Sequence, residues 1–123
     1  MTFPTGATTG APLDLASTTA RVQSQALAVD TAADITADDS GKAFILNPDA
    51  APLGQVLPPV DADAIGFTVT IVNIDDANAV NVTSETDNFN GAAGPVAIPA
   101  GESRTFIAVQ FDGGAFGYAV VGA

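Results

Sequence analysis

Apolar and polar residues alternate in short runs from about residue 25 to the end of the chain. In the clearest run, residues 66–73, Phe67, Val69 and Ile71 fall on one face of a strand. The residues between them, two threonines and a valine, fall on the other. This spacing predicts a strand with one face in a core and the other half-exposed or at an interface. Shorter runs of the same kind predict further strands at residues 27–29, 43–46, 55–57, 80–83, 95–98, 105–111 and 116–121.

Turn-forming residues separate these runs. Residues 38–41 and 112–114 combine aspartate with glycine, and Pro58-Pro59 closes the run at 55–57. The segment Asp75-Asp76-Ala77-Asn78 predicts a hairpin turn, so residues 80–83 should return antiparallel to residues 66–73. Seven or eight short strands with turns between them predict an all-β fold, an antiparallel β-sandwich of jelly-roll-like type or a small barrel.

The first 24 residues differ from the rest. They are rich in turn-forming and small polar residues, as in Pro4-Thr5-Gly6, and are too poor in large apolar groups to fold alone. We expect an extended N-terminal arm over residues 1–24 and a β-domain over residues 25–123. The arm either is disordered or becomes ordered on a neighbouring protein, with Leu13, Leu15 and Val22 as apolar anchors.

Charge and composition exclude several functions. The 123 residues carry 14 acidic and 3 basic groups, a net charge of -11, which argues against phosphate contacts and so against nucleic-acid binding. Cysteine and histidine are absent, so the usual ligands of zinc and haem and the nucleophile–histidine pairs of hydrolases are missing. No enzyme activity and no cofactor are expected. Only 14% of residues are charged and 47% are hydrophobic, which favours a folded domain over an acidic disordered chain.

The start of the chain has no basic region followed by an apolar one, and no apolar run is long enough for a membrane helix. We therefore expect synthesis in the cytoplasm and no membrane partner.

Candidate polar sites have simpler structural interpretations. The acidic pairs Asp38-Asp39, Asp61/Asp63 and Asp75-Asp76 are spaced for acid–base chemistry but lie in predicted turns, where solvated carboxylates are common. Residues 85–91 form the densest group of oxygen ligands, a candidate calcium site that lacks the EF-hand spacing. Lys42 is expected to pair with a neighbouring aspartate.

The aromatic residues near the C-terminus leave two interpretations open. Phe106, Phe111, Phe116 and Tyr118 either fill the core or contribute in part to an interface, where aromatic residues are enriched. Arg104 either is solvated or reaches an acidic partner across a subunit boundary. We expect Arg104, Phe116 and Tyr118 to contribute to a subunit interface.

A chain of short motifs resembles a β-domain of virion structural proteins in tailed bacteriophages. Residues 34–44 resemble its opening, residues 66–73 its central strand, and residues 98–103 one of its turns. Weaker matches follow the family's order at residues 57–59, 90–91 and 111–113. The family often has a tryptophan in its last turn, where this chain has Phe116 and Tyr118.

The resemblance, which covers residues 25–123, implies a virion protein, commonly a homotrimer. A single small domain with an arm fits a capsid decoration (cement) protein that binds the major capsid protein on the exterior of the assembled phage head and stabilises it. The arm would bind the capsid through Phe3, Pro4, Leu13, Leu15, Arg21 and Val22. The alternative is a head-fibre or tail-fibre module that recognises host glycans, with Asp87, Asn88, Asn90 and Tyr118 as its contacts.

Overall fold

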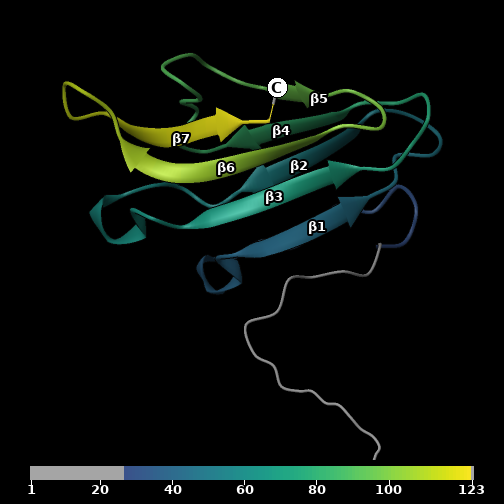
Figure 1. Ribbon diagram of the computed structural model, residues 1–123, viewed down its shortest axis with the longest axis horizontal. Coiled ribbons are helices and arrows are strands. Elements are labelled where there is room, and N and C mark those ends of the chain that lie inside the picture. The colour runs from purple at the N-terminus through teal and green to yellow at the C-terminus, as the bar shows by residue number, and fades with distance from the viewer. Residues whose placement is uncertain (1–26, 123) are drawn as a thin grey trace, which may run out of the picture.

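Seven strands form two sheets in a computed structural model that describes residues 27–122 (Figure 1). The strands are β1 (Lys42–Leu46), β2 (Leu53–Leu57), β3 (Thr68–Asn73), β4 (Val80–Ser84), β5 (Val96–Ile98), β6 (Ser103–Gln110) and β7 (Phe116–Val121). Two short 3₁₀ helices, η1 (Ala37–Asp39) and η2 (Ala62–Ala64), precede β1 and β3. The all-β fold is thus confirmed. No helix within residues 27–122 has the length and apolar character needed to cross a membrane.

The strand order is β1-β3-β6-β7 in one sheet and β2-β4-β5 in the other. The pairs β1–β3 and β2–β4 are parallel, and the other three pairs are antiparallel, so the sheets are mixed rather than purely antiparallel. Each parallel pair skips one strand in sequence, because the chain alternates between the two sheets from β1 to β4.

The hairpin expected between residues 66–73 and 80–83 is wrong. β4 lies in the second sheet, paired with β2 and β5, and does not pair with β3. The side chain of Asn73, buried at the end of β3, explains the crossing, because its amide donates to the backbone oxygens of Asn78 and Ile98 and its oxygen accepts from the Asp75 N–H. These bonds tie the end of one sheet to the first residues leading into the other.

Alternation along the strands places the core between the sheets. β3 and β4 bury every second residue, and β6 buries Phe106 and Ala108. Phe67, Phe89, Phe106 and Tyr118 pack together, with ring centroids 6.0–6.5 Å apart. Phe89 comes from the loop between β4 and β5, so a residue expected only in a loop completes the aromatic core.

The strand expected at residues 27–29 is absent from the structure. The Leu27 N–H donates to the Ile45 oxygen at 3.1 Å, but the chain then turns at Val29 and Asp30, and Val29 is exposed. Asp30 has φ 56°, in the left-handed region, which ends any extended pairing. The expected arm, residues 1–24, lies outside the described residues.

Candidate interaction surface

One face of the four-stranded sheet carries no charged side chain. Pairing across the sheet aligns Ala43, Thr70, Thr105 and Val121 in one row, since each is the register partner of the next. Their sequence neighbours point into the core, so this row points outward. We call this surface the charge-free face, and its members are Ala43, Ile45, Thr68, Thr70, Val72, Ser103, Thr105, Ile107, Val109, Ala119 and Val121.

The charges of the described residues lie elsewhere. Every acidic residue within 27–122 falls in a turn, a loop or a 3₁₀ helix, outside the seven strands. Lys42 and Arg104 are the charged residues of the strands, and both share the core-facing side, opposite Val69 and Ile71 respectively. An acidic protein repels other acidic surfaces, and this face is the part of the described sheet where that repulsion is weakest.

The face is apolar and half-exposed rather than solvated. Most of its members are intermediate in burial, and Val121 is 49% exposed. The hydroxyls of Thr70 and Thr105 hydrogen-bond to each other at 2.9 Å across β3 and β6, which satisfies polar atoms that solvent would otherwise cover. A surface of this kind is suited to packing against another protein, where aliphatic groups gain by leaving water.

Asparagine side chains cover the open edge of β7. Asn90 accepts from the Val120 N–H and donates to the Val120 oxygen, and the backbone of Asn88 and Asn90 pairs with both polar groups of Tyr118. The Asn88 amide also donates to the Phe116 oxygen. The edge is therefore closed to a further strand.

These contacts also account for the oxygen-rich segment expected as a calcium site. The side-chain oxygens of Asp87, Asn88 and Asn90 accept from the backbone N–H groups of Gly94, Gly91 and Val120. The segment holds its own loop against β7.

The predicted interface residue Arg104 is satisfied within its own chain, which corrects both interpretations of it. Its guanidinium donates to the backbone oxygens of Ser103 and Gly122 and to the Glu102 carboxylate at 2.9 Å. Only 11% of its side chain is exposed, because it lies on the core-facing side at the end of β6. It ties the C-terminal end of β7 to the start of β6.

Tyr118 belongs to the core, which corrects its expected place at a subunit interface and as a glycan contact. It is 1% exposed, stacks on Phe89 and donates its hydroxyl proton to the Pro58 oxygen. Burial disfavours the charged phenolate and raises the pKa of Tyr118 well above its ordinary value. Phe116 is half-buried and packs against the same core. The interpretation of these aromatic residues as core filling is the better one.

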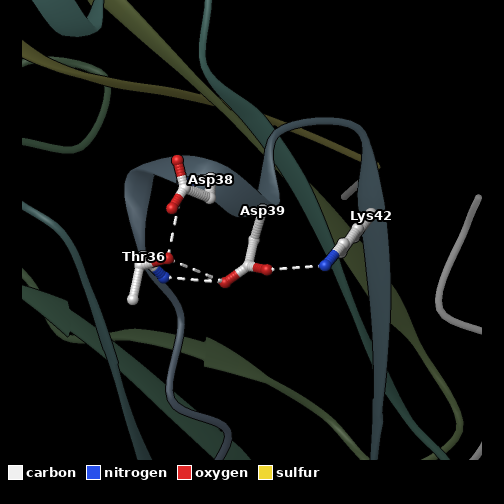
Figure 2. A network of polar contacts seen from close by, with 4 residues as sticks. All are labelled: Thr36, Asp38, Asp39 and Lys42. Atoms are coloured by element: carbon white, nitrogen blue, oxygen red, sulfur yellow. Dashed lines mark hydrogen bonds and ion pairs between the residues drawn. The ribbon is translucent and has the colours of Figure 1, made fainter. Parts of the chain in front are cut away.

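The expected partner of Lys42 is Asp39, at 2.8 Å (Figure 2). The Asp39 carboxylate also accepts from the Thr36 N–H, while the Thr36 hydroxyl accepts from the Asp38 N–H, which forms a capping box at the start of η1. The Lys42 ammonium and the Thr36 N–H hold the pKa of Asp39 below its ordinary value of 3.8. The network therefore fixes the turn that leads into β1.

Asp75 has the same role in the crossing between the sheets. Its carboxylate accepts from the backbone N–H groups of Asn78 and Ala77, which lowers its pKa below 3.8. Both carboxylates stabilise turns in their ionised form.

We therefore expect acid sensitivity that starts at a defined pH. A carboxyl whose pKa is lowered by folding adds stability above its unfolded value, and that stability is lost as the pH falls through the folded value. The free energy of unfolding should be nearly constant from about pH 7 to about pH 5 and fall steeply below 3.8. Urea unfolding followed by circular dichroism at a series of pH values measures this. Combined Asp39→Asn and Asp75→Asn should lower stability at neutral pH and flatten the acid slope, and an unchanged slope would contradict the assignment.

A hollow of about 350 Å³ lies between the 3₁₀ helices and the loop after β2. Its lining is mainly apolar and includes Pro58, Pro59, Ile65 and Phe67, with Ser40 and Asp63 among its polar members. The Ser40 hydroxyl accepts from the Thr68 N–H, so it is engaged by the fold. No pair of acid–base groups converges in this hollow, and its residues were not singled out by the sequence pattern.

The charge-free face could not be recognised from sequence, because its members come from four strands whose order the sequence pattern does not give. The threonine and valine alternation of residues 68–72 was the one signal of it. The expected arm contacts Phe3, Pro4, Leu13, Leu15, Arg21 and Val22 lie outside the described residues. No model of a known protein family matches the chain, and no curated protein matches it either.

Proposed function

We propose that this protein is a capsid decoration (cement) protein that binds the exterior of an assembled phage head as a homotrimer and stabilises it without catalysis. The observation that carries the proposal is the charge-free face. A chain of net charge -11 presents there an apolar sheet surface with no acidic group. Such a face favours contact with protein, either another copy or the major capsid protein.

The other features agree with a structural role. The resemblance of residues 25–123 to the virion β-domain supplies the expectation of a phage head or fibre. The candidate polar groups outside the face are used within the chain, as for Arg104, Asp39 and Asn88. Binding many copies to the assembled lattice, and not to free capsid subunits, would stabilise that lattice by linkage.

The test uses phage heads assembled without this protein. Adding the purified chain should give cosedimentation with the heads and raise the temperature of their calorimetric transition by several degrees. Ile107→Glu, which places a charge in the centre of the charge-free face, should weaken binding by at least about tenfold, because the charge would be buried without a partner.

The matched control is Gln110→Glu, which adds the same charge at an exposed position of the same strand outside this face. Equal binding by both variants would show that the charge-free face is not the contact. Substituting Leu13 and Leu15 by serine tests the arm in the same assay, with loss of binding expected. A virion map with density for the chain at the tail tip and none on the head would overturn the cement role in favour of a fibre.

Glycan recognition is the alternative outcome of that map. Stacking on sugars requires exposed aromatic rings. Within residues 27–122 every aromatic side chain is buried or half-buried, and Tyr118, the expected stacking residue, is 1% exposed. The described surface thus favours a protein partner over a sugar.

A further inference from the structure

The free edge of β1 is the unprotected edge of the four-stranded sheet. β7, at the other edge, is covered by Asn88 and Asn90. Edge strands are usually protected by charges, proline or bulges, but Ala43-Phe44-Ile45-Leu46 contains none of these. An apolar edge of this kind pairs readily with another strand.

The chain enters the described structure on this edge. The Leu27 N–H donates to the Ile45 oxygen at 3.1 Å, and the Asp30 N–H donates to the Asn47 oxygen at 2.9 Å. Both acceptors lie on the free side of β1, since Leu46, between them, directs its oxygen to Ile74 beyond β3. Residue numbers rise in the same direction on both segments, so the incoming chain runs parallel to β1.

We propose that residues 22–26 of the same chain add to this edge as a strand parallel to β1 and complete a five-stranded sheet. In a parallel ladder, a residue donates to the residue before its partner and accepts from the residue after it. The bond from Leu27 to Ile45 therefore makes Leu46 the partner of Leu27. Continuing the register makes Phe44 the partner of Gln25, whose N–H then faces the Ala43 oxygen and whose oxygen faces the Ile45 N–H.

Side-chain chemistry supports the same register independently. Leu27 packs against the core, so Gln25 and Gln23 fall on the core-facing side and Ala26, Ser24 and Val22 on the outer side. The outer residues are small and uncharged, so they extend the charge-free face by one strand. A slip by one residue would place Leu27 and Arg21 on that face instead. The inference concerns the fold of this chain and does not depend on the proposed function.

Within residues 27–122, the N–H groups of Ala43 and Ile45 have no backbone partner, and neither does the N–H of Val56 on the outer edge of β2. The added strand would bond the first two and leave Val56 unchanged. Amide hydrogen exchange of the full chain, followed by NMR, should therefore be at least about tenfold slower at Ala43 and Ile45 than at Val56 after correction for intrinsic rates. Equal exchange at the three amides would overturn the proposal.

Two proline variants give a matched pair. Gln25→Pro removes the N–H that faces β1, whereas Ser24→Pro removes one that faces away from it. Exchange at Ile45 should accelerate about tenfold in Gln25→Pro and stay unchanged in Ser24→Pro. The amide of Ile71, in the middle of β3, should be unaffected in both and reports that the domain remains folded. The same behaviour in both variants would overturn the register.

The identity of the added strand is tested with a sample that mixes two isotope labels. Nuclear Overhauser contacts between residues 23–26 and residues 43–45 are expected within one chain. Contacts between differently labelled chains would show that a second copy supplies the strand and would overturn the intrachain assignment.

Discussion

Replacing Phe106 with alanine should lower the free energy of unfolding by about 3–5 kcal/mol. Phe106 is 0% exposed and lies edge-on to Phe89 at 6.0 Å and to Tyr118 at 6.4 Å. Removing its ring would leave a cavity between rings supplied by β6, β7 and the loop after β4, which cannot all move inward together. Chemical denaturation followed by circular dichroism measures the loss.

The control is Ile107→Ala, the next residue of the same strand. Ile107 lies on the charge-free face and is half-buried, so its truncation should cost only about 1 kcal/mol. A similar loss in the two variants would mean that both faces of the sheet are equally buried. In a monomer this would contradict the described core, and in an oligomer it would show that a partner covers the outer face.

A single added methyl group at Gly117 should destabilise the protein by about 2–3 kcal/mol. A Cβ atom at this position would meet the backbone oxygen and the side chain of Asn88 at distances no neighbouring atoms tolerate. That Asn88 oxygen accepts from the Tyr118 N–H, so the methyl group would push the loop off β7 and break the bond that keeps the loop there. Thermal and urea unfolding of Gly117→Ala measure the loss, and exchange of the Tyr118 amide should increase.

Gly54→Ala is the matched control, because Gly54 is also a strand glycine without a positive φ. No atom lies within 4 Å of the position its Cβ would take. Alanine there should be neutral or stabilising by about 0.5 kcal/mol, since it reduces the entropy of the unfolded chain. Destabilisation of equal size at both positions would show that loss of glycine itself, and not the contact with Asn88, is responsible.

Local patterns gave reliable predictions where the physics is local. Alternation placed the cores of β1, β2, β3, β6 and β7 within a few residues of the observed bounds, because a half-buried strand needs an apolar residue at every second position. The turn at residues 38–41 and the Lys42–Asp39 pair were also predictable, since both partners lie within one turn of the chain.

The predictions for single functional residues were weaker. Arg104 and Tyr118 were expected at an interface because charged and aromatic residues are frequent there. In the structure the first bonds Gly122, and the second bonds Pro58 through its hydroxyl. Both partners are distant in sequence, so no local signal could distinguish an internal role from an external one.

Alternation along the chain was sufficient for the all-β class, the number of strands and the core residues of most of them, because burial of one strand face depends only on period. It could not assign partners to the strands. Val80 and Val82 would pack equally well in either sheet, and Asn73 directs the chain to the second one through a bond to Ile98, 25 residues away. The charge-free face depends on the same strand order, since it exists only where β1, β3, β6 and β7 lie side by side (Figure 1).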